Sequence, residues 1–73
     1  MEKEIQIKTP FIKLDALLKF ADVVSSGGEA KLLIQDGLVF HNGEACTMRG
    51  KKCVSGDVIV VQGVTISVRE GGV

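Results

Sequence analysis

The residues with the clearest chemical potential are the cations of one short stretch, Arg49-Gly50-Lys51-Lys52. The nearest acidic residues in the sequence are Glu44 and Asp57, so no charge partner stands directly beside this stretch. A lysine or arginine that neutralises a nucleic-acid phosphate releases condensed counterions, and this release favours binding. The stretch therefore predicts a phosphate-binding loop. A solvated basic surface without a ligand is the alternative.

A second candidate anion site is the stretch Ser26-Gly27-Gly28-Glu29. Its spacing predicts a capping box, in which the Ser26 hydroxyl accepts from the amide three residues later and Glu29 reaches back to the Ser26 amide. Two glycines would leave the first-turn amides uncovered at the positive end of the helix dipole, where a phosphate can bind. An ordinary helix cap is the alternative reading.

Lys13 and Lys31 lie near the predicted helix starts, where the helix dipole does not favour a cation. A bound anion would explain their placement. Lysine stems that lie over apolar neighbours would explain it equally well.

The thiols and the imidazole predict neither a metal site nor a catalytic site. Cys46 and Cys53 are the two cysteines and His41 is the one histidine, whereas structural zinc usually takes four such ligands. Catalytic serine or cysteine arrangements at a credible spacing are also missing, as are the glycine motifs of nucleotide-binding loops. We therefore expect reduced, partly buried thiols, no metal, no cofactor, no small-molecule substrate and no enzymatic activity.

Two helices with a tight turn between them should position these residues. Leu14, Leu17, Leu18 and Ala21 have the spacing of one buried helix face, and this helix is predicted to end near 23–25. The second helix is predicted to follow the Ser26 cap and to end at Gly37, a natural left-handed residue. Its predicted buried residues are Ala30, Leu33 and Ile34.

Strands are predicted on both sides of the helix pair. Residues 4–8 alternate apolar and polar side chains and stop at Thr9-Pro10. After Gly37 the period changes to two, and Asn42-Gly43 is a strong hairpin signal that predicts a return strand over 44–48. Two further strand-like runs are split at Gln62-Gly63. The expected class is α+β: a leading strand, a helix-turn-helix-like pair, then a small, mainly antiparallel sheet of about four short strands.

Length and charge set the remaining bounds. The 73 residues suffice for one domain, 1–73, and no apolar run approaches the roughly 18–20 residues that cross a bilayer. No secretory signal is apparent, so the expected compartment is the cytoplasm and no membrane partner is expected. Nine basic and nine acidic residues balance overall, yet residues 8–52 hold seven basic residues against five acidic ones.

Over residues 12–61, the chain resembles an S4 RNA-binding domain, and its short form is similar to small stand-alone bacterial S4 proteins of the YaaA/YbcJ kind. The family pattern has a basic-Leu-Asp start to the first helix, a Ser-rich turn, a Glu-Ala-basic start to the second helix, an Asn-Gly hairpin and a late Gly-Asp. The matching residues are Lys13-Leu14-Asp15, Ser25-Ser26, Glu29-Ala30-Lys31, Gly37-Leu38-Val39, Asn42-Gly43 and Gly56-Asp57.

The resemblance implies an S4-like (alpha-L) fold and a non-catalytic module that binds structured RNA, either ribosomal RNA or tRNA, with the ribosomal subunit as a further expected partner. Many S4 domains have arginine directly after the serine pair, and this chain has Gly27 there. The RNA-binding residues that the resemblance implies are Lys13, Ser26, Lys31, Asn42, Arg49, Lys51 and Lys52, and Gly27 is a further candidate through the uncovered amides of the first helical turn.

Two other function classes stay open from the sequence. A ubiquitin-like sulfur carrier fits the length and the near-terminal Gly71-Gly72 pair, although a β-grasp chain places a hairpin before its helix. A protein-interaction adaptor fits the neutral net charge. RNA retention that weakens as salt rises would separate the RNA-binding class from both.

Overall fold

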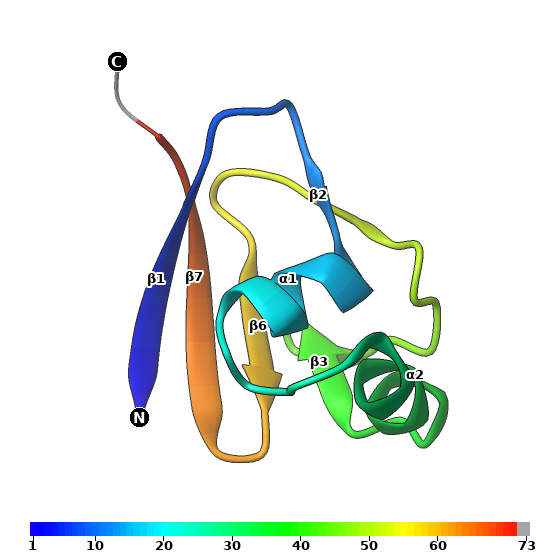
Figure 1. Ribbon diagram of the computed structural model, residues 1–73. Coiled ribbons are helices and arrows are strands. Elements are labelled where there is room, and N and C mark those ends of the chain that lie inside the picture. Colours follow the sequence, from blue (N-terminus) through cyan, green and yellow to red (C-terminus); the bar gives the residue numbers. More distant parts are fainter. Residues whose placement is uncertain (72–73) are drawn as a thin grey trace.

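The computed structural model describes residues 1–71 as a five-stranded sheet with two short helices packed over one face (Figure 1). The predicted α+β class, with a leading strand, a helix pair and then short strands, is confirmed. In chain order the elements are β1 (Glu2–Ile7), β2 (Ile12–Lys13), α1 (Leu14–Phe20), α2 (Gly27–Gln35), β3 (Val39–His41), β4 (Glu44–Ala45), β5 (Lys52–Cys53), β6 (Val58–Val61) and β7 (Val64–Glu70).

The strand order of the main sheet is β1-β7-β6-β3-β4, so the last strand lies between the first strand and β6. All neighbours are antiparallel except β1 and β7, which run parallel from Glu2 opposite Thr65 to Ile7 opposite Glu70. The short strands β2 and β5 form a separate antiparallel pair. Because β2 pairs with β5 rather than with β1, no hairpin precedes the helices, which does not fit the β-grasp order of a sulfur carrier. Gly72 of its proposed diglycine lies outside the described residues.

Two tight hairpin turns join the antiparallel strands where the sequence predicted them. Asn42 and Gly43 have φ of 51° and 88°, and Gln62 and Gly63 have φ of 50° and 76°. Positive φ at both central residues is the type I′ geometry, which matches the twist of the flanking strands. The predicted return strand over 44–48 is too long, since β4 ends at Ala45. The chain leaves the sheet there to carry the basic stretch toward α1.

Helix α1 ends at Phe20, so the predicted end near 23–25 is wrong. Asp22 has φ of 60°, its N–H donates to the Lys19 carbonyl at 3.0 Å, and the Val23 N–H donates to the Leu18 carbonyl at 3.1 Å. These two bonds satisfy the last carbonyls of the helix in the way a glycine terminator usually does. Aspartate is among the few residues that tolerate this left-handed conformation, so the helix stops without a glycine.

Helix α2 begins and ends largely as predicted. The Ser26 hydroxyl accepts from the Glu29 N–H at 3.2 Å, and Gly37 follows the helix with φ of 74°. The other half of the predicted capping box is wrong. The Glu29 carboxylate accepts from the Ser25 hydroxyl at 3.2 Å, a donor one residue before the cap, instead of from the Ser26 amide.

The core between the helices and the sheet is apolar throughout residues 1–71, with no buried polar side chain among them. The predicted α1 face is buried, as are Ala30 and Ile34 of α2, while Leu33 is half-buried. Neither described helix has the length and hydropathy to cross a bilayer. The largest fully buried side chains are Leu14, Leu17, Leu18, Ile34, Ile59, Ile66, Val39, Val61, Val68 and Cys53.

Candidate nucleic-acid interface

The pairing of β2 with β5 brings together cations that are far apart in the sequence. Lys13 lies directly opposite Lys52 in this antiparallel pair. The Leu14 N–H, in the first turn of α1, donates to the Lys51 carbonyl at 2.9 Å. The next amide along the helix donates to the Arg49 carbonyl at 3.2 Å. The basic loop is therefore held against the start of α1. We call Lys13, Arg49, Lys51 and Lys52 the basic cluster.

The charges of the basic cluster are uncompensated within residues 1–71, because neither ion pair of this part of the chain includes one of its members. Lys51 is half-buried and the other three members are exposed. The adjacent acid, Asp15, directs its carboxylate to its own helix, where it accepts from the Ala16 N–H at 2.8 Å. The Lys52 ammonium lies 4.9 Å from the centre of the Phe11 ring, a cation–π contact that leaves its charge intact.

The predicted residues of α2 lie apart from the basic cluster, and no hydrogen bond or ion pair of residues 1–71 joins the two groups. The Ser26 hydroxyl is occupied by its cap bond to the Glu29 N–H. Gly27 has open space around it, since a Cβ built there would meet no atom within 4 Å. Lys31 is exposed. This end of α2 is thus accessible, but the structure does not bring it into contact with the basic loop.

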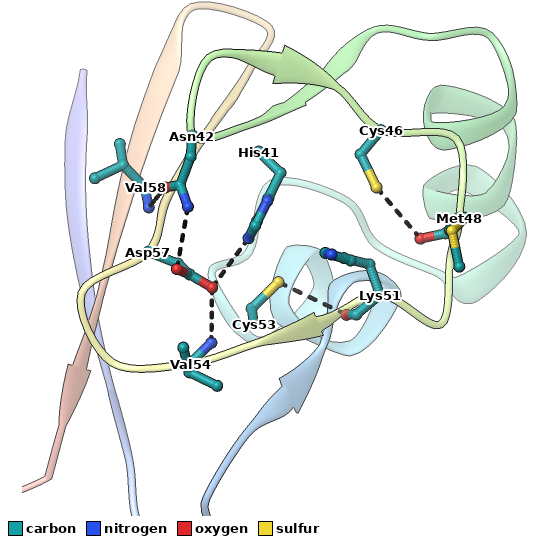
Figure 2. Close-up of polar contacts among 9 residues, drawn as sticks. All are labelled: His41, Asn42, Cys46, Met48, Lys51, Cys53, Val54, Asp57 and Val58. Atoms are coloured by element: carbon teal, nitrogen blue, oxygen red, sulfur yellow. Dashed lines mark hydrogen bonds and ion pairs between the residues drawn. The ribbon is translucent and has the colours of Figure 1, made fainter.

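Asn42 uses its side chain inside the protein. Its Nδ2 donates to Asp57 Oδ1 at 3.2 Å, and its Oδ1 accepts from the Val58 N–H at 2.8 Å (Figure 2). Its backbone N–H also donates to the Val58 carbonyl at 2.8 Å. The side chain therefore fastens the β3–β4 turn to the start of β6, and its contact with RNA stays a prediction.

Asp57 is the centre of a group of polar contacts between two turns (Figure 2). Its Oδ2 lies 2.9 Å from His41 Nε2 and accepts from the Val54 N–H at 2.9 Å. The side chains of His41 and Asp57 are only 17% and 14% exposed. We call His41, Asn42 and Asp57 the turn cluster.

The carboxylate form of Asp57 is favoured in this setting. Partial burial by itself would raise the pKa of Asp57, but the hydrogen bonds from the Val54 N–H, His41 and Asn42 outweigh it and hold the pKa below its ordinary value. Because an ionised carboxylate only accepts hydrogen bonds, His41 Nε2 must carry the proton that it shares with Asp57.

Both cysteines are free thiols, as predicted, and Cys53 lies beside the turn cluster. Burial raises the pKa of the Cys53 thiol to about 11, with further increases from the Asp57 carboxylate and Cys46, opposed by Lys51. Its Sγ makes one long contact, 3.7 Å from the Lys51 carbonyl oxygen. Cys46 is half-buried and borders a shallow hollow with His41, Met48 and Lys51.

A metal ion could be held here, because ligand atoms of His41, Cys53 and Asp57 all lie within 4.8 Å of one another. Two cysteines and one histidine are fewer than the four ligands usual for structural zinc, so no metal site was predicted, and Asp57 was not among the candidate ligands. The one signal for Asp57 was the Gly56-Asp57 pair, which matched the late Gly-Asp of the S4 pattern. No sequence spacing could reveal the grouping, since the three residues come from separate strands and turns.

Comparisons with known proteins agree with this architecture. A family model described as S4 domain matches residues 5–69. A relative named probable ribosome maturation protein RlbA, from Bacillus subtilis (strain 168), is 41% identical over 63 residues. The match covers 86% of this chain and 89% of the relative, so the two are similar along almost their whole lengths.

Proposed function

Because the chain belongs to the S4 domain family, a family of RNA-binding domains, we propose that it binds structured ribosomal RNA during ribosome maturation and uses the basic cluster to contact phosphates. The name of its Bacillus subtilis relative supports the ribosomal assignment, and tRNA is the alternative structured RNA. The observation that carries the proposal is the convergence of four cations, none of them ion-paired within residues 1–71, on the surface formed by β2, β5 and the start of α1.

The geometry suits recognition of RNA shape. Folded RNA is recognised largely through phosphate and sugar positions, for which fixed cations are sufficient. Two backbone hydrogen bonds to the first turn of α1 hold the basic loop, so its charges have a defined place on the surface. Gly27 and Lys31, at the exposed start of α2, would extend the contact along the backbone of a larger RNA.

A pair of charge-matched variants tests the site. Arg49→Ala with Lys52→Ala removes two exposed cations from the basic cluster. Lys8→Ala with Arg69→Ala removes the same two residue types from exposed positions in and beside the β1–β7 pair. We expect the first variant to weaken binding to a structured ribosomal RNA by at least about tenfold at moderate salt, because phosphate contacts are lost. The matched control should bind within about twofold of the unaltered chain.

Fluorescence anisotropy with labelled ribosomal RNA, and with unlabelled tRNA as competitor, provides the measurement. Equal losses in the two variants would show that binding follows overall charge rather than this surface. No binding of the unaltered chain to either RNA would refute the proposed function. Stronger competition by tRNA than by ribosomal RNA would identify tRNA, rather than ribosomal RNA, as the preferred ligand.

A further inference from the structure

Three side chains outside the basic cluster bring different metal-binding donors to one point. An imidazole nitrogen of His41, the sulfur of Cys53 and a carboxylate oxygen of Asp57 lie within 4.8 Å of one another. Figure 2 shows these side chains between the β3–β4 hairpin and β5. We propose that His41, Cys53 and Asp57 form a binding site for a thiophilic divalent cation of the zinc class.

The distances between the three ligand atoms are close to those of a zinc site, so binding an ion would require only small side-chain movements. Zinc takes sulfur at about 2.3 Å and nitrogen or oxygen at about 2.0–2.2 Å, so tetrahedral donors stand roughly 3.3–3.6 Å apart. His41 Nε2 and Asp57 Oδ2 are now 2.9 Å apart, as expected while a proton bridges them. An ion that replaces this proton pushes the pair slightly apart and draws the Cys53 sulfur closer, by shifts of about 1 Å.

Charge balance favours a divalent ion in this setting. Cys53 has 0% exposure, and an uncompensated charge in such a position is costly. On binding, the Cys53 thiol loses its proton to solvent and binds as thiolate, and Asp57 binds as the carboxylate it already is. His41 binds through Nε2, so its single ring proton moves from Nε2 to Nδ1 by exchange with solvent. One thiolate and one carboxylate thus neutralise the cation, and one proton is released.

Neighbouring groups already hold the carboxylate in place. Asn42 Nδ2 donates to Asp57 Oδ1 at 3.2 Å, which leaves Oδ2 directed at His41. Such outer hydrogen bonds orient metal ligands and contribute to affinity. Of the three proposed ligands, His41 borders the hollow that is also lined by Cys46, Met48 and Lys51. Because Cys53 directly follows Lys52 of the basic cluster, a bound ion would fasten the basic loop to the β3–β4 hairpin.

Cobalt provides a spectroscopic probe for this site. The full chain, kept reduced with a phosphine and freed of metal with a chelator, is titrated with Co²⁺ and then with Zn²⁺. We expect one Co²⁺ per chain, a thiolate-to-cobalt charge-transfer band with the intensity of a single thiolate, displacement by Zn²⁺ and a rise in Tm on binding. Cys53→Ala should abolish the band and weaken binding at least about 100-fold, since loss of even an outer-sphere partner costs about 10- to 100-fold.

Cys46→Ala is the matched control, because it removes the other thiol and leaves the proposed ligands intact. It should keep the band and bind Co²⁺ within about threefold of the unaltered chain. Should Cys53→Ala not fold without metal, Cys53→Ser replaces it, and the band must still vanish. Absence of a thiolate band in the unaltered chain, or an equal loss in Cys46→Ala, would overturn the site. RNA binding is measured separately and does not enter this test.

Discussion

At the scale of single residues, the Asp57 side chain has more hydrogen-bond partners than any other side chain in residues 1–71. One carboxylate joins His41 of β3, Asn42 of the β3–β4 turn and the Val54 amide that precedes β6. These partners come from the β3–β4 hairpin and from the segment before β6, which are distant in the sequence. The late Gly-Asp of the S4 pattern therefore has a physical reason in this chain, because a carboxylate is needed to accept several hydrogen bonds at one point.

Asp57→Asn should destabilise the fold. The asparagine amide can accept fewer of these bonds and leaves at least one half-buried donor unsatisfied, at a cost of about 1–3 kcal/mol in the free energy of unfolding. Urea unfolding of the metal-free chain at neutral pH measures it. The control is Asp36→Asn, an exposed acid at the end of α2, for which we expect a change within about 0.5 kcal/mol. Equal behaviour of the two variants would show that Asp57 does not hold the turns together.

Individual roles were predictable only where they depend on near neighbours. The Ser26 cap was predicted correctly because its partner is three residues away. The internal role of Asn42 and the grouping of Cys53 with His41 and Asp57 were not predicted. They depend on strand pairing over more than ten residues, for which no local pattern exists. The convergence of Lys13 with the basic loop likewise required the pairing of β2 with β5.

At the scale of elements, Gly27 within α2 and Gly37 just after it have different backbone conformations and therefore different roles. Gly37 follows the helix in a left-handed conformation with φ of 74°, whereas Gly27 stands in the first turn of the helix. A Cβ added at either position would meet no atom within 4 Å. Any difference between the two alanine variants therefore reports backbone preference rather than packing.

Gly37→Ala should lower the free energy of unfolding by about 1–2 kcal/mol, because an L-residue in the left-handed region is strained. Gly27→Ala should raise it by up to about 1 kcal/mol, because alanine restricts the unfolded chain and favours helix. Thermal and urea unfolding of both variants test the pair. A destabilised Gly27→Ala would contradict the helical assignment of that position. A stabilised variant that binds RNA less well would indicate that the bare backbone contacts phosphate.

Elements with strong local signals were predicted well and short or unusual ones were not. Both hairpin turns were found from Asn-Gly and Gln-Gly pairs, which adopt positive φ readily. The end of α1 was missed because Asp22, rather than a glycine, takes the left-handed conformation. β2 and β5 have two residues each, too few to show an alternating pattern. The parallel pairing of β1 with β7 leaves no trace in local periodicity.

At the scale of the whole molecule, the net charge is zero but the charged residues are unevenly distributed. The chain has nine basic and nine acidic residues. Four of the basic residues gather at β2 and β5 without ion pairs in residues 1–71, while Arg69 is paired with Glu4 at 3.6 Å on the β1–β7 side. A domain without net charge can therefore still present one cationic surface to a polyanion.

The salt dependence of RNA binding should reflect this local charge. Four phosphate contacts predict a slope of about −3 to −4 when the logarithm of the association constant is plotted against the logarithm of salt concentration. Loss of Arg49 and Lys52 should reduce the slope by about half. Anisotropy titrations between low and moderate salt provide the values. A slope near zero would exclude phosphate contacts as the source of affinity, and a much steeper one would show that cations beyond the basic cluster take part.

The position of β7 in the sheet limits the order in which the strands can pair while the chain is being synthesised. β7 lies between β6, which directly precedes it in the chain, and β1, which is made first. Until residues 64–70 have left the ribosome, β1, which holds the core residues Ile5 and Ile7, lacks its one neighbour in the sheet. Contacts this distant in sequence also form slowly. The support of the cationic loop, β2 and the start of α1, is therefore made before the loop itself, whereas β1 can join the sheet only after β7 is made.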